Sequence, residues 1–160
     1  MDLESISSGC IEIQVLDYYS QLLKAQFEAK YGLLPPSMLY HEQISQQIPT
    51  NCHHVPVDAD AVQIHYLQDH YVVSAKYKNS ITVYDSLRNS CRIQDLQQQL
   101  INMYGNISSM DINYVVSQSQ GSTLDCGVFA AANIVTLMHG RNPTNVFLNQ
   151  HLIVLIFVIK

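Results

Sequence analysis

The sequence predicts an α+β domain in which a mostly antiparallel sheet packs against helices. A helix-like segment comes first, strand-like segments follow it, and further helix-like segments end the chain. Segments 71–77 and 81–84 are separated by Lys78-Asn79-Ser80, a polar turn typical of an antiparallel hairpin. Segment 126–139 is apolar on nearly every side, which indicates a helix buried at the centre.

Length and composition predict one domain with a sizeable core. The chain has 160 residues, of which 48% are apolar and 13% charged. We expect a loose tail at 1–10 and a single domain at 11–160. A net charge of -5 argues against nucleic-acid binding, and the apolar run 152–159 is too short to span a membrane. Since no secretory signal precedes the four cysteines, we expect an intracellular protein, nuclear or cytoplasmic. We also expect a monomer.

The elements can be placed in order along the chain. Ile11, Ile13 and Val15 alternate with polar residues, which predicts a short strand, and apolar spacing predicts a helix over 17–31 that stops at Gly32. Residues 37–60 are expected to be loop with one short helix. Strands are predicted at 61–67, 71–77, 81–84 and 111–116, and helices at 92–104 and 126–139. Pro143 can open a last helix.

A reactive thiol is predicted where the apolar helix begins. Asp125 is a good N-cap, so Cys126 falls in the first helical turn. The unpaired N–H groups and the helix dipole favour negative charge there, and therefore the thiolate. Gly127 removes bulk beside the sulfur, and Gln120 ends a polar loop that could fold over the same place. Such a thiol needs a base.

Among seven histidines, His70 has the geometry of that base. It begins the strand 71–77, and Asp85 ends the strand 81–84. If the hairpin closes with His70 directly opposite Asp85, the carboxylate can accept the Nδ1–H of the imidazole. Base and nucleophile would then form a triad with Asp85, while Gln120 and the Cys126 N–H bind an oxyanion.

Structural explanations compete with these roles. Cys126 could be a packed core thiol, and His70 a surface strand residue. Asp85 could cap a turn, and Gln118 could replace Gln120. A further cluster, Cys52-His53-His54 with His65, contains metal-ligand types, but its spacing matches no common zinc site. We therefore expect no metal and no cofactor.

Three motifs, in their order along the chain, resemble those of the ubiquitin-like-protease family. These are the SUMO-deconjugating cysteine proteases and their viral and transposon-borne relatives. The motifs are His70-Tyr71-Val72-Val73, Val83-Tyr84-Asp85-Ser86-Leu87, and Gln120 followed after five residues by Cys126-Gly127-Val128-Phe129. The resemblance covers roughly residues 15–150, and the stretch after Cys126 is most similar to transposon-encoded members.

The resemblance implies a permuted papain-like fold and a set of roles. His70 would be the general base, Asp85 its partner, Gln120 the oxyanion donor and Cys126 the nucleophile. The implied activity is that of a thiol-dependent peptidase or isopeptidase. It would cleave after the C-terminal tail of a ubiquitin-like protein, SUMO-like in kind, or after a related small-residue site. The expected partner is thus a ubiquitin-like protein or its conjugates.

Two departures leave alternatives open. The sequence has no Trp, and Tyr71 stands where family members use a Trp to cover the substrate tail, so we expect Tyr71 to bind substrate. The run 152–159 lacks a polar face, which fits a buried closing strand or a truncated copy. A catalytically decayed module that binds ubiquitin-like proteins is therefore the main alternative, and acyl transfer by the same residues is a remote one.

Overall fold

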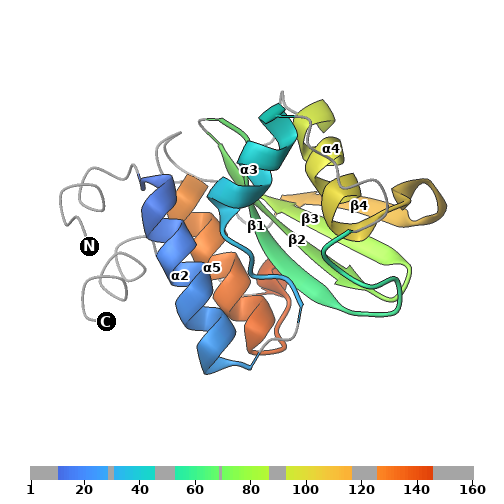
Figure 1. Cartoon of the computed structure of the whole chain (residues 1–160). Coiled ribbons are helices and arrows are strands. Elements are labelled where there is room, and N and C mark those ends of the chain that lie inside the picture. The colour runs from blue at the N-terminus through green and yellow to red at the C-terminus, as the bar shows by residue number, and fades with distance from the viewer. Residues whose placement is uncertain are drawn as a thin grey trace.

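The computed structural model describes residues 11–28, 31–45, 53–68, 70–86, 93–116 and 126–145 (Figure 1). The expected tail at 1–10, the run 152–159, Gln120 and Asp125 lie outside these residues. Within the described part of the chain, no helix is long and apolar enough to cross a membrane.

A four-stranded sheet forms the centre. Its strands are β1 (Ala61–Tyr66), β2 (Tyr71–Tyr77), β3 (Ser80–Asp85) and β4 (Asp111–Val116), in the order β1-β2-β3-β4. The first three pair antiparallel and β4 pairs parallel to β3, because α4 (Ile93–Tyr104) carries the chain back across the sheet. The prediction of a mostly antiparallel sheet is confirmed.

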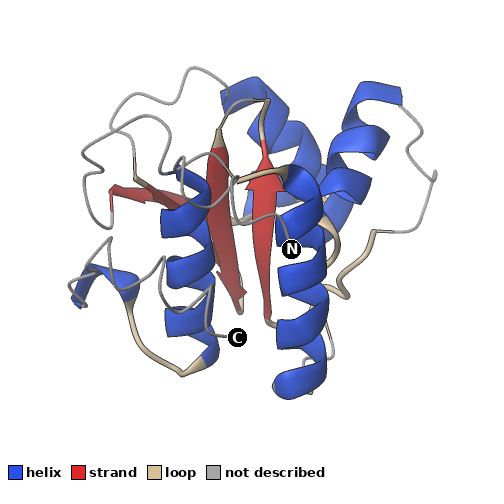
Figure 2. Ribbon diagram, turned by 90° about the vertical axis from the view of Figure 1, so that its left-hand side faces the viewer, coloured by secondary structure: helices blue, strands red, loops and turns tan. Residues whose placement is uncertain are grey.

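Helices cover both faces of this sheet. On one side, α2 (Ile13–Gln26) and α5 (Cys126–Met138) run alongside each other, and on the other lie α3 (Pro36–Ser45) and α4 (Figure 1). Figure 2, viewed from the side of α2 and α5, shows strands behind and between these two helices. Short 3-10 turns occupy Ile107–Ser109 and Pro143–Asn145, so Pro143 opens a helical turn, and the residues that would continue it lie outside the described part of the chain.

The strands divide their apolar side chains between two cores. Ile64, Val73 and Tyr84 pack toward α2 and α5, whereas Val72 and Val83 pack toward α3 and α4. This division follows from the alternation of side chains along a strand. The apolar helix α5 is buried along Cys126 to Ala131 as predicted, and its alanines allow close packing on the sheet.

The first helix begins earlier than the sequence analysis expected. Ile13 and Val15 belong to α2, so the predicted short strand is absent from 11–15 and the helical start near residue 17 is wrong. The pattern Ile13, Leu16, Leu23 continues a helical face, and a period-two pattern over only three residues could not distinguish the two structures.

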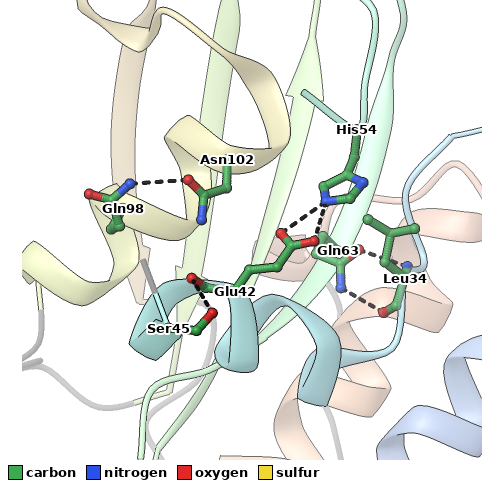
Figure 3. A network of polar contacts seen from close by, with 7 residues as sticks. All are labelled: Leu34, Glu42, Ser45, His54, Gln63, Gln98 and Asn102. Atoms are coloured by element: carbon green, nitrogen blue, oxygen red, sulfur yellow. Dashed lines mark hydrogen bonds and ion pairs between the residues drawn. The ribbon is translucent and has the colours of Figure 1, made fainter. Parts of the chain in front are cut away.

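The helix α2 ends at Gln26, so Gly32 does not stop it as expected. Gly32 is needed because the chain passes very close to β1 at this residue. Gly32 has φ +81°, and a Cβ there would lie 2.3 Å from the Val62 carbonyl oxygen. The next residue, Leu33, donates its N–H to that same oxygen at 2.9 Å. The buried Gln63 amide holds Leu34 in turn, accepting its N–H and donating to its carbonyl (Figure 3).

Candidate active site

The Cys126 side chain lies at the first residue of α5, as predicted. It forms no disulfide with any residue that the structure describes, and it is only 5% exposed. The first N–H groups of a helix have no partner within the helix, so this position favours an anionic sulfur. The predicted oxyanion donor Gln120 lies outside the described residues, and its role stays a prediction.

The hairpin that carries His70 and Asp85 has a different register from the predicted one. Lys78 has φ +52° and forms a two-residue loop with Asn79, so Tyr77 pairs with Ser80 and Val73 with Tyr84. Continued by one residue, this register places Asp85 opposite Val72. The prediction that His70 directly faces Asp85 is therefore wrong, because that pairing would set Tyr77 opposite Lys78 and leave no residue for the loop.

Asp85 still reaches His70 across the diagonal of the hairpin. The register differs from the predicted one by two positions, which leaves both side chains on the same face. A diagonal neighbour is farther away than a directly opposed one. The distal ring nitrogen spans this distance: His70 Nε2 lies 2.8 Å from Asp85 Oδ1. The predicted contact through Nδ1 is therefore wrong. Nδ1 lies on the other side of the ring and can face a different group.

Cys126 interacts with the same imidazole. His70 is 8% exposed, and burial by itself lowers its pKa. The Asp85 carboxylate and the Cys126 sulfur overcome this effect and raise the pKa of His70 to about 9. Nδ1 is buried without a hydrogen bond of good geometry within the described residues. Because Asp85 occupies Nε2, Nδ1 is the nitrogen available to the sulfur.

Tyr71 is more enclosed than a residue that covers a substrate would need to be. Its side chain is 7% exposed, and its hydroxyl donates to the Ile11 carbonyl at 3.1 Å. A Cβ at Gly127 would lie 3.3 Å from Tyr71 Cδ2, so the ring packs directly on the start of α5. Its predicted role in substrate binding stays a prediction.

Two other histidines, His65 and His54, have structural partners. His65 is fully buried and interacts with Gln99 and Ser74 at 3.0 and 2.7 Å. His54 pairs with both carboxylate oxygens of Glu42 (Figure 3). No group of three metal-ligating side chains forms among the described residues, and the two histidines belong to separate contacts.

Sequence reasoning missed one residue beside the site. Ile11 was placed in a strand, but it lies next to α2, accepts the Tyr71 hydroxyl and would touch a Cβ at Gly127 at 3.2 Å. Ile11 is separated from Tyr71 by sixty residues in the chain. No local pattern could have indicated such a contact.

Comparisons with known proteins show similarity of the fold. No family model and no curated protein sequence matches the chain. The SUMO protease Ulp1 with its catalytic cysteine oxidized to a sulfinic acid superposes with a TM-score of 0.68 at 14% identity, covering 99% of this chain and 79% of that one. The chain has the fold of the Ulp1-like SUMO proteases.

Two further structures support that statement. The C-terminal Ulp1 protease domain in complex with Smt3, the yeast ortholog of SUMO, gives a TM-score of 0.62 at 11% identity and covers 99% and 81% of the two chains. The Ulp1-like SUMO protease catalytic domain of Chaetomium thermophilum gives 0.57 at 16% identity and covers 94% and 70%. The similarity to transposon-encoded members stays a prediction.

Proposed function

We propose that this protein is a thiol-dependent peptidase or isopeptidase that cleaves after the C-terminal tail of a ubiquitin-like protein. The observation that carries the proposal is the arrangement around His70, which bonds to Asp85 at 2.8 Å while Cys126 helps to raise its pKa to about 9. This arrangement favours an imidazolium beside an anionic sulfur, which is the activated state of a nucleophilic cysteine.

In the first step, the thiolate of Cys126 attacks the carbonyl carbon of the last residue of the substrate tail. The negative charge moves to the carbonyl oxygen, where the Cys126 N–H and, by the sequence prediction, Gln120 would donate hydrogen bonds. As the tetrahedral species collapses, His70 gives its Nδ1 proton to the leaving amine. A thioester between the tail and Cys126 remains.

In the second step, water releases the tail. Neutral His70 accepts a proton from the water through Nδ1, and the resulting hydroxide attacks the thioester. The carboxylic acid leaves and the sulfur again faces an imidazolium. Asp85 keeps Nε2 engaged throughout, so the ring cannot turn its other nitrogen toward the sulfur.

The substrate class rests on the resemblance of the motifs and on the fold. The Ulp1 structures with this fold are SUMO proteases, and one of them is in complex with the yeast ortholog of SUMO. We therefore propose a SUMO-like protein or its conjugates as substrate. The burial of Tyr71 in this chain favours the alternative, a module that binds such proteins without cleaving them, because the substrate tail would lose its aromatic cover.

A ubiquitin-like protein with a vinyl sulfone at its C-terminus separates the two functions. We expect the parent protein to form a covalent adduct at Cys126, identified by mass spectrometry of the peptide that contains it. Cys126→Ala should bind the same protein without capture, and Cys91→Ala should be captured like the parent. Binding by the parent without any adduct would support the module and contradict the enzyme.

Turnover gives the second measurement. We expect Cys126→Ala to abolish cleavage of a SUMO-like precursor, because no other group in the proposed mechanism attacks the carbonyl. Equal cleavage by Cys126→Ala and the parent protein would exclude Cys126 as the nucleophile.

A further inference from the structure

Tyr71 joins three separate segments beside the proposed nucleophile. Its ring packs on Gly127 in the first turn of α5, its hydroxyl bonds to the Ile11 carbonyl ahead of α2, and its own backbone begins β2. Tyr66 also packs against the ring, at 5.1 Å between the ring centroids. Tyr71 is therefore fixed by contacts along its whole length.

These contacts lie immediately beside the proposed catalytic pair. Tyr71 follows His70 on the strand, and Gly127 follows Cys126 on the helix. The contact between Tyr71 and Gly127 is thus displaced by one residue, on both elements, from the pair formed by His70 and Cys126. A change in the first contact shifts the backbone that carries the second.

Very little space is left in this contact. A Cβ at Gly127 would lie 3.2 Å from Ile11 Cβ and 3.3 Å from Tyr71 Cδ2. Such separations are tighter than ordinary van der Waals contact. The ring therefore limits how closely α5 approaches β2, and the bond to Ile11 limits how far the ring can tilt.

We propose that Tyr71 is a positioning residue that sets the distance between Cys126 and His70, with its hydroxyl bond to Ile11 as the part that holds the ring in place. This inference rests on the proposed function, since it assigns Tyr71 to the same site. It differs from the role expected from the sequence, in which Tyr71 contacts the substrate.

Tyr71→Phe tests the inference, because it removes the hydroxyl and keeps the ring. Tyr66→Phe is the matched control: it removes a hydroxyl from the adjacent ring, whose oxygen makes no hydrogen bond in the described residues. The measurement is the rate at which iodoacetamide alkylates Cys126, followed by mass spectrometry on the full chain near pH 6 and near pH 9. An isolated thiol is mostly protonated near pH 6, so fast alkylation there requires a neighbouring imidazolium.

For Tyr71→Phe we expect alkylation near pH 6 to slow by about fivefold, the effect of losing one hydrogen bond, and the rate near pH 9 to stay within about twofold. Tyr66→Phe should match the parent at both pH values. With a cleavable SUMO-like precursor, Tyr71→Phe should lower kcat and leave KM unchanged. Gly127→Ala, which pushes against the same ring, should slow alkylation near pH 6 in the same way.

Three results would overturn the inference. Parent-like alkylation in Tyr71→Phe excludes a positioning role, and so does an equal slowing at both pH values with a lower Tm, which indicates general loss of structure. A raised KM with unchanged kcat would return Tyr71 to substrate contact. If the parent alkylates as expected and Tyr71→Phe slows it, yet no precursor is cleaved, the positioning role is supported and the proposed function fails.

Discussion

The imidazole of His70 lies between two groups that favour its protonated form. Burial removes water from the charged ring and so opposes protonation, but Asp85 and Cys126 outweigh it and raise the pKa of His70 to about 9. The imidazolium is therefore present below about pH 9 and is lost as the pH rises through that value. Because this form is also the proposed acid, we expect cleavage to decline over the same range.

Asp85→Asn should weaken catalysis and move this decline to lower pH. Asparagine has the shape of aspartate but carries no negative charge, so the pKa of His70 should fall from about 9 toward its ordinary value. We expect kcat/KM to drop roughly 100-fold. The measurement is kcat/KM between pH 5 and pH 10 with a SUMO-like precursor.

Asp111→Asn is the control for this change, because Asp111 is an exposed carboxylate at the start of β4. It should reproduce the profile of the parent. An Asp85→Asn profile that keeps its basic limb near pH 9 would show that Asp85 does not control the ionisation of His70.

At the scale of elements, β1 is tied to the segment that follows α2. Leu33 bonds to the Val62 carbonyl, and Gln63 pairs with both backbone groups of Leu34. The segment can approach so closely only because Gly32 has no side chain. These contacts fix where α3 begins, and α3 packs on β1 and α4.

Gly32→Ala should therefore destabilise the fold strongly. The added Cβ meets the Val62 carbonyl oxygen at 2.3 Å, and the backbone has φ +81°, where an alanine is strained. Gly140→Ala is a matched control, since Gly140 has φ +72° and no atom lies within 4 Å of the added Cβ. We expect a loss of about 1 kcal/mol at Gly140 and at least about 2 kcal/mol more at Gly32, measured by urea unfolding.

Equal losses at the two glycines would show that backbone strain alone accounts for the effect. The close approach to β1 would then contribute nothing measurable to stability.

At the scale of the whole molecule, a buried chain of hydrogen bonds joins the sheet to the helices opposite the site. The Gln99 amide oxygen can only accept, so His65 donates from Nδ1, and in the neutral ring Nε2 then accepts from the Ser74 hydroxyl. Ser74 in turn accepts from the Tyr104 hydroxyl at 2.9 Å. Gln99 also donates to Gln43 in α3. These directions are those of a neutral His65.

Acid should therefore weaken the fold through His65. Burial lowers the pKa of His65 to about 4, despite the opposing hydrogen bond to Gln99, whereas the unfolded chain takes up this proton near pH 6.5. The stabilisation is complete above pH 6.5 and is lost as the pH falls toward 4. The stability advantage of the parent over His65→Gln should shrink by about 3 kcal/mol between pH 7 and pH 4.

Urea unfolding at several pH values measures this difference, and the other titrating groups cancel because they are common to both proteins. His41→Gln, which changes an exposed histidine, should show no such pH dependence. An advantage that stays constant from pH 7 to pH 4 would mean that His65 can be protonated inside the fold.

Local patterns in the sequence predicted much of the fold. The strands at 71–77 and 111–116 and the apolar helix after residue 125 lie where they were expected, because alternation and helical spacing act over a few neighbouring residues. The start of α2 was misplaced because three alternating residues fit two structures. Gly32 was taken for a helix stop, although its conformation is required by β1, which is thirty positions away.

The sequence by itself determined which groups stand at the site: Cys126 at a helix start, and His70 and Asp85 on one face of a hairpin. A register error of two positions did not change that face, because side chains alternate with a period of two. Only the tertiary structure decided that Nε2 of His70 meets Asp85 and that Ile11 and Tyr71 enclose the start of α5. Those contacts depend on distances between segments far apart in the chain, and packing alone sets such distances.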